Sequence, residues 1–224
     1  MSRLPLVDRV DYLRRACRGR RVLHLGCTNW PYTAAALADR ALLHLALQTE
    51  AAELWGLDAD QEGLDVLAAR GFERLLRADL ERLEELELPE PAPRFDVIVA
   101  GEIVEHLSNP GLFLSGVRRL MTQETRLILT TVNAYCGMRG VVYALRGRGG
   151  RVEPVHPDHV AYYSYATLRH LLARHGFVVR DFLFYDLGPE HRPHNRWWAN
   201  RVNDLCVAIA PQLADGLIAD CTLD

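Results

Sequence analysis

The sequence predicts an α/β fold: a Rossmann-like, doubly wound sheet of seven strands whose last strand is antiparallel. Short apolar runs alternate with amphipathic segments along the chain, a pattern typical of parallel strands covered by helices. With 224 residues, of which 49% are hydrophobic and 25% charged, the chain has the length and composition of one globular domain. No repeat or linker divides it, so we expect residues 1–224 to form a single domain.

The first half of the chain supplies the beginning of this alternation. A leading amphipathic helix is predicted over 4–18, followed by a buried strand over 21–25 that ends at a glycine. Proline is tolerated in a first helical turn, and glycine is a common C-cap, so Pro31 and Gly71 mark helix boundaries. The remaining elements predicted in this half are helices over 31–50 and 61–70 and strands over 54–57, 74–77 and 95–100.

The second half continues the same pattern with one irregular stretch. Residues 133–158 have weak periodicity and contain the basic, glycine-rich piece RGRGGR, which favours a mobile loop. The apolar runs near the C-terminus favour a pair of strands with a helix between them. The elements predicted here are helices over 112–121, 165–175 and 195–213 and strands over 126–132, 177–184 and 216–222.

Charge and cysteine content narrow the function classes. The net charge is −3 and all 26 basic residues are arginine, which excludes a P-loop lysine or a Schiff-base lysine and argues against a nucleic-acid partner. The five cysteines show no CxxC spacing and are expected to be free thiols in a reducing compartment. The sequence shows neither a membrane-spanning run nor a signal-peptide pattern. We therefore expect a cytoplasmic protein that has no membrane partner.

Polar residues and glycine follow four successive predicted strands. In open α/β sheets, ligands bind at the carboxyl ends of the strands. Gly26 and Cys27 follow the first of these strands, Asp58 the second, Asp79 the third and Glu102 the fourth. A glycine lets the backbone approach a ligand, and an acid can accept hydrogen bonds from a ribose diol. This arrangement predicts a cofactor that contains a nucleoside.

The same segments resemble the class I S-adenosylmethionine-dependent methyltransferases over most of residues 20–185. The resemblance rests on VLHLGC (22–27), WGLDAD (55–60), LRADLERL (76–83), FDVIVAGEIVEHLSNPGLFL (95–114), RLILTTVN (126–133) and TLRHLLARHGFVV (167–179). It implies S-adenosylmethionine as cofactor, bound by residues 1–132, with acceptor-side insertions at 133–165 and 186–200. The residues it implies for the cofactor are Gly26 and Cys27 at the methionine end, Asp58 and Ala59 at the ribose, Asp79 and Leu80 at the adenine, and Glu102 beside the sulfonium.

One segment departs from the family pattern. The family's first motif has an acid followed by G-x-G-x-G, whereas this chain has His24 in place of the acid and Thr28 in place of the second glycine. The loop after the first strand must therefore turn with fewer residues that tolerate positive φ. A methyltransferase-like scaffold that has lost its activity is the alternative that these two residues support.

Glu102, Glu105 and His106 form an E-x-x-E-H motif. If the segment is a short helix, the i, i+3 and i+4 spacing places all three side chains on one face, where they could hold Mg or another divalent metal. The motif resembles that of ubiquinone-pathway O-methyltransferases and of small-RNA 2′-O-methyltransferases, and the latter resemblance adds His159 as a further ligand. Without a metal, His106 or His159 is the candidate catalytic base for the acceptor.

These observations predict a methyltransferase that acts on an oxygen, or a nitrogen, of a small polar metabolite. RNA 2′-O-methylation with a divalent metal is the alternative within the fold, but it predicts a basic binding face. A nicotinamide oxidoreductase is disfavoured because the chain lacks G-x-G-x-x-G. The aromatic residues at 162–165 and the segment 191–198 are candidates for the acceptor wall. The leading and C-terminal helices are candidate surfaces for a homodimer.

Overall fold

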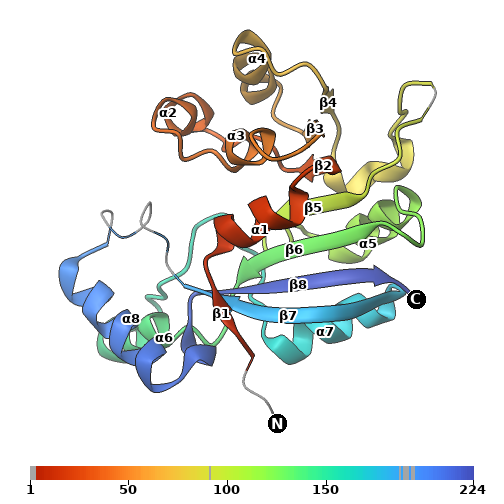
Figure 1. Ribbon diagram of the computed structural model, residues 1–224. Coiled ribbons are helices and arrows are strands. Elements are labelled where there is room, and N and C mark those ends of the chain that lie inside the picture. Colours follow the sequence, from red (N-terminus) through yellow and green to blue (C-terminus); the bar gives the residue numbers. More distant parts are fainter. Residues whose placement is uncertain (1–3, 91, 187, 189–191, 193–194) are drawn as a thin grey trace.

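The computed structural model describes residues 4–224 except 91, 187, 189–191 and 193–194, and it contains one mixed sheet with helices on both sides (Figure 1). The strand order in the sheet is β1-β7-β8-β6-β5-β2-β3-β4. The strands are β1 Leu6–Val7, β2 Arg21–Leu25, β3 Glu53–Asp58, β4 Leu75–Arg77, β5 Val97–Gly101, β6 Arg126–Val132, β7 Phe177–Tyr185 and β8 Gly216–Leu223. The helices are α1 Arg9–Cys17, α2 Thr33–Ala38, α3 Leu43–Gln48, α4 Gln61–Ala69, α5 Pro110–Arg119, α6 Gly137–Arg146, α7 Tyr165–Arg174 and α8 Trp197–Ile209, with 3₁₀ turns at Leu80–Glu85 and Pro211–Leu213.

The predicted Rossmann-like sheet is confirmed, but it has eight strands rather than seven. β8 runs antiparallel to both β6 and β7, as expected of the last strand. The additional strand is β1, which pairs in parallel with the end of β7 at the edge of the sheet. It arises because 4–18 is not one helix: the Asp8 side chain accepts a hydrogen bond from the Asp11 N–H, so the helix begins after Asp8 and the residues before it are extended.

Two helical layers bury the sheet. On one face, Phe113 of α5 and Leu172 of α7 belong to a core cluster with Leu25 of β2 and Ile98 of β5. On the other face, α1 and α3 pack over the same central strands, with fully buried side chains from both helices. The central strands are therefore largely buried and mostly apolar, which is the reason that their positions could be predicted closely.

Two predicted helices have different limits in the structure, and one region predicted as a loop contains a helix. The helix expected over 31–50 is divided into α2 and α3 because Arg40 adopts a left-handed conformation with φ 57°, and the N–H groups of Ala41 and Leu42 both return to the Ala36 carbonyl. The region 133–158 contains α6 instead of being loop throughout. The last predicted helix ends at Ile209, and a 3₁₀ turn beginning at Pro211 follows.

The structure also describes the state of the cysteines and the lengths of the helices. All five cysteines are free thiols, and four of them are buried. Among the described residues, no helix is both long enough and apolar enough to cross a bilayer.

Candidate active site

The polar residues predicted at the strand ends lie along one edge of the sheet. The strands β5, β2, β3 and β4 are parallel neighbours, and their registers align Leu25 with Ala100 and Asp58 with Arg77. Gly26 directly follows the last residue of β2, and Glu102 directly follows the last residue of β5. Both therefore lie at the same edge of the sheet as Asp58. This carboxyl edge, as we call it below, is where doubly wound sheets bind nucleotides.

The loop after β2 turns sharply at Gly26. Its φ is 72°, and any side chain here would collide with the Ile103 side chain, so only glycine fits. Thr28, at the position of the family's second glycine, is accommodated by a glycine elsewhere. A Cβ on Gly63 of α4 would lie 2.8 Å from the Thr28 Cβ, so the absence of that Cβ makes room for the threonine. Threonine in place of the family's second glycine therefore fits here, because the glycine on α4 leaves room for its side chain.

Asp58 organises the same loop. Its Oδ2 accepts a hydrogen bond from the Thr28 N–H at 2.9 Å, and its Oδ1 accepts one from the Asp60 N–H at 3.0 Å. Each carboxylate oxygen has a second lone pair, which leaves acceptor capacity for a ligand diol. Ala59, the next residue, is exposed. The half-buried Asp58 is therefore a structural residue of the loop as well as the candidate ribose acceptor.

Asp79 and Leu80 follow β4 at the far end of the carboxyl edge. The Asp79 Oδ1 accepts the Glu81 N–H at 2.9 Å and caps the 3₁₀ turn, while the rest of the side chain is exposed. Leu80 is 9% exposed and packs in the main core cluster. Its side chain therefore serves the core, and Asp79 is the more accessible of the two residues predicted for the adenine.

His24, at the family's acidic position, pairs with a second buried histidine. The Nδ1 atoms of His24 and His44 are 3.1 Å apart and the rings are stacked. Gly56 on the neighbouring strand provides the space, because a Cβ there would lie 2.9 Å from the His44 Cε1. Burial lowers the pKa of His44 to about 4 and lowers that of His24 well below its usual value. Both rings are therefore neutral at neutral pH.

Glu102 does not lie on a helix with Glu105 and His106, as the spacing predicted. It has a left-handed backbone with φ 57°, and residues 104–106 form a turn. The Tyr185 hydroxyl donates to the Glu102 Oε1 at 2.7 Å, and the Arg9 Nη1 lies 3.4 Å from the Glu102 Oε2. The prediction that these three residues share one face of a helix is thus wrong, because the left-handed backbone of Glu102 directs its side chain toward α1 and β7.

Glu105, His106 and His159 do come together. Among the described residues, these three offer ligand atoms that all lie within 4.8 Å of one another, so three of the four predicted metal ligands form one cluster and Glu102 is outside it. The rings of His106 and His159 are 4.6 Å apart. Glu105 is fully buried, and the Thr131 hydroxyl donates to its Oε2 at 2.9 Å. In the part of the chain that the structure describes, its Oε1 has no hydrogen-bond partner.

The environment shifts the pKa of two members of this cluster. Burial, reinforced by the nearby Glu102 carboxylate, raises the pKa of Glu105 to about 7. Burial, reinforced by the neighbouring His106 and His156 rings, lowers the pKa of His159 to about 4. Shifts of this kind are common where groups are arranged for chemistry or for ligand binding.

Several residues around the cluster carried no local signal in the sequence. Thr131, Arg9 and Tyr185 come from three different elements, and only the fold brings them to Glu102 and Glu105. Tyr162 was predicted only as part of an aromatic acceptor wall; its hydroxyl lies 3.3 Å from the His159 Nδ1.

The rest of the predicted acceptor wall is only partly described. Tyr163 is buried, and the Tyr165 ring packs edge-on against Phe182. In the segment 191–198, residues 191, 193 and 194 lie outside the described residues. Trp197 is 77% exposed, whereas the Trp198 ring lies 5.0 Å from the Arg146 guanidinium.

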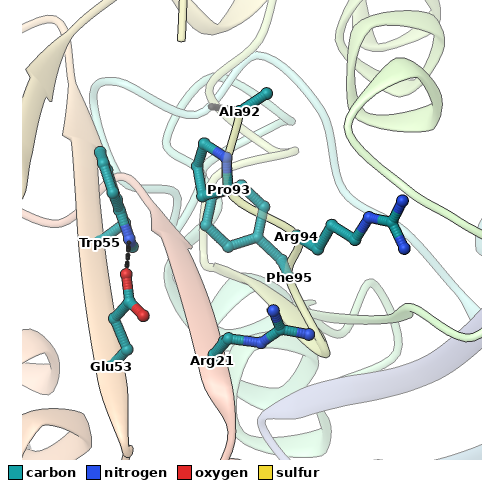
Figure 2. Close-up of a pocket in the computed structure, with 7 residues that line it drawn as sticks. All are labelled: Arg21, Glu53, Trp55, Ala92, Pro93, Arg94 and Phe95. Carbon is teal, nitrogen blue, oxygen red and sulfur yellow. Dashed lines mark hydrogen bonds between the residues drawn. The ribbon is translucent and has the colours of Figure 1, made fainter. Parts of the chain in front are cut away.

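A cavity of about 370 Å³ lies elsewhere on the molecule (Figure 2). Its lining includes Arg21 and Glu53, the first residues of β2 and β3, and Trp55, whose Nε1–H donates to Glu53. It therefore lies at the amino ends of these strands, opposite the carboxyl edge. We assign no part of the predicted cofactor site to it.

Comparison with known proteins identifies relatives over nearly the whole chain. Residues 5–181 match the family model described as "Methyltransferase domain". The ubiquinone biosynthesis O-methyltransferase of Xylella fastidiosa is 30% identical, and the match covers 91% of this chain and 80% of that protein. A methyltransferase from Mesorhizobium loti superposes with a TM-score of 0.58 at 14% identity, covering 95% of both chains. Magnesium protoporphyrin IX methyltransferase from Synechocystis, determined with bound S-adenosylhomocysteine, has a TM-score of 0.53 at 14% identity, covering 96% of this chain and 81% of that one.

Proposed function

Since the chain belongs to the class I S-adenosylmethionine-dependent methyltransferases, we propose that it methylates an oxygen of a small polar metabolite, using the histidine cluster at the carboxyl edge to manage the acceptor proton. The observation that carries this proposal is the grouping of Glu105, His106 and His159 beside the strand ends that would bind the cofactor. Oxygen is preferred to nitrogen because the Xylella relative is named an O-methyltransferase.

The residues at the carboxyl edge suit the cofactor. Gly26 has no side chain, so a ligand can approach its backbone, and Asp58 accepts a hydrogen bond from the Thr28 N–H in the loop that Gly26 begins. We assign Gly26 and Cys27 to the methionine end, Asp58 with Ala59 to the ribose, Asp79 with Leu80 to the adenine, and Glu102 to the neighbourhood of the sulfonium. When bound, S-adenosylmethionine supplies an activated methyl group on a positively charged sulfur.

The protein contributes to methyl transfer in two ways: it aligns the acceptor with the methyl group, and it accepts the proton that the acceptor hydroxyl loses. Holding the acceptor oxygen in line with the methyl group lowers the barrier by removing the entropy cost of orientation. A hydroxyl acceptor must also lose its proton. His159 contacts Tyr162 and His106, and because burial lowers its pKa to about 4, its ring is unprotonated at neutral pH. A positioned base typically contributes about 10²–10⁴-fold to the rate, and the low pKa of His159 makes it a weaker base, which favours the lower end of that range.

A divalent ion is the second form of this proposal, and one specific observation supports it. The Glu105 Oε1 is buried without a partner, which is costly unless a ligand satisfies it. Together with His106 and His159 it offers one carboxylate and two imidazoles. This donor set suits Fe, Mn or Zn better than Mg, because imidazole favours transition metals. Such an ion would be a Lewis acid that lowers the pKa of the acceptor hydroxyl.

Methyl transfer from radiolabelled S-adenosylmethionine to a panel of phenols, catechols, sugars and amines tests the proposal. We expect labelled product with hydroxyl acceptors, and a loss of roughly 10²-fold or more in kcat for His159→Gln with little change in the affinity for S-adenosylhomocysteine. Transfer only to amines, or an unimpaired His159→Gln variant, would contradict it. Assays in chelator, followed by re-addition of Mn, Fe, Zn or Mg, separate the metal-free form from the metal-dependent form.

A further inference from the structure

The first residue of α1 reaches the carboxyl edge. The Arg9 Nε–H donates to the Thr130 hydroxyl on β6 at 3.1 Å, and its Nη1 lies 3.4 Å from the Glu102 Oε2. The guanidinium also lies 5.7 Å from the centre of the Tyr185 ring. The Arg9 side chain is only 14% exposed, so these contacts fix its position.

A neighbouring glycine makes this approach possible. A Cβ on Gly101, the last residue of β5, would lie 3.0 Å from the Arg9 Nη2. That distance is tighter than an ordinary van der Waals contact, so a side chain at this position would press on the guanidinium. The end of β5 is therefore shaped to receive an arginine from α1.

Glu102 is held from two sides. One of its carboxylate oxygens faces Arg9 from α1, and the other accepts a hydrogen bond from the Tyr185 hydroxyl on β7. Its left-handed backbone conformation is unfavourable for a residue other than glycine. The ion pair and the hydrogen bond offset that cost. The Glu102 side chain nevertheless remains 30% exposed, so a ligand can reach it.

We propose that Arg9, assisted by Tyr185, is a positioning residue that holds the Glu102 carboxylate in the orientation that faces the positively charged sulfonium of the bound cofactor. The inference rests on the proposed place of Glu102 beside the sulfonium. This positioning role accounts for the presence of the mostly buried Arg9 cation at the edge of a site whose cofactor is itself positively charged near the reacting atom. Arg9 acts on the carboxylate, and the carboxylate acts on the cofactor.

The charge of the cofactor gives this arrangement a distinctive signature. S-adenosylmethionine carries a methyl group and a positive charge on its sulfur, whereas S-adenosylhomocysteine lacks both and is otherwise the same molecule. A carboxylate directed at the sulfur therefore favours the first over the second. Loss of the positioning contacts should reduce that preference, whereas general damage to the fold would weaken both ligands alike.

Calorimetric titration of the full chain with each ligand tests the inference. For Arg9→Gln we expect the affinity for S-adenosylmethionine to fall roughly tenfold more than that for S-adenosylhomocysteine, which is the order of a lost charge-assisted contact. Tyr185→Phe should shift the ratio in the same direction, and Arg9→Lys should recover part of it. Arg14→Gln is the matched control, because Arg14 lies on α1 but pairs with Glu50 at 2.7 Å. It should leave the ratio unchanged.

A double-mutant cycle identifies the residue through which Arg9 acts. In a Glu102→Gln background, Arg9→Gln should cause no further change in the ratio of the two affinities. Equal weakening of both ligands by Arg9→Gln would show that Arg9 contacts a part they share, and it would overturn the inference. An unchanged ratio would also overturn it, and so would a stronger preference for S-adenosylmethionine, because loss of the Arg9 charge alone favours a positively charged ligand. A wild-type protein that binds neither ligand would contradict the proposed cofactor site itself, a result distinct from a failure confined to the variants.

Discussion

The buried histidine pair is expected to make the folded protein lose stability as the pH falls below about 6.5, the usual pKa of histidine. In the unfolded chain His24 and His44 bind protons near that pH. In the folded protein burial lowers both pKa values, that of His44 to about 4. The stabilising contribution is therefore complete above pH 6.5 and is lost as the pH falls toward 4, because protons then favour the unfolded state.

The size of the effect follows from the pKa of His44. A change of one pKa unit corresponds to about 1.4 kcal/mol, so lowering the pKa to about 4 makes the unfolding free energy fall by about 2 kcal/mol between pH 7 and pH 5. His24 adds to this loss in the same direction. Other titrating groups contribute a background, so a variant is needed to isolate the pair.

Urea denaturation of the wild type and of His44→Leu across this pH range provides the assay. His44→Leu removes the partner of the His24 Nδ1 and should cost roughly 1–3 kcal/mol at pH 7. Its pH dependence should be shallower than that of the wild type by about 2 kcal/mol over the range. His170→Gln, at an exposed position on α7, should keep the wild-type dependence. Identical pH dependence in wild type and His44→Leu would show that the buried histidine pair does not cause the loss of stability at low pH.

Two further substitutions test the loops at the carboxyl edge. Asp58→Ala should lower the unfolding free energy by about 2 kcal/mol, because two backbone N–H groups lose their acceptor. It should also weaken S-adenosylhomocysteine binding at least roughly tenfold in calorimetry. A folded variant that binds this ligand with wild-type affinity would show that Asp58 is not a ribose ligand. Gly26→Ala should lose more stability in urea denaturation than Gly71→Ala, because both glycines have positive φ but only Gly26 faces a side chain, that of Ile103. Equal losses would show that the loop can relax.

The strands could be predicted closely because physical constraints act on them locally. A strand buried on both faces is mostly apolar, so the predicted strands at 21–25 and 126–132 coincide with β2 and β6. Helix limits depend on single contacts that leave little trace in a sequence. The Asp8 cap shortens the first helix, and the left-handed Arg40 divides the second. The helix α6 is amphipathic although it has no buried residue, and the glycine-rich stretch RGRGGR that begins at its last residue, Arg146, favoured a loop for the whole region.

The site was predictable only where its residues follow strands directly. Gly26 and Asp58 lie where the parallel topology must place them. The E-x-x-E-H motif failed as a helical face because Glu102 adopts positive φ, which the i, i+3, i+4 spacing does not reveal. Arg9 and Tyr185 lie 93 and 83 positions away from Glu102, and no local pattern connects residues so distant.

The most direct test of the proposed function is calorimetric titration of the purified wild-type protein with S-adenosylmethionine, S-adenosylhomocysteine and NAD. We predict that both sulfur nucleosides bind with affinities in the micromolar range and that NAD does not bind. Failure of both sulfur nucleosides to bind would contradict it, because it would mean that Thr28 and His24 leave no functional cofactor site at the carboxyl edge.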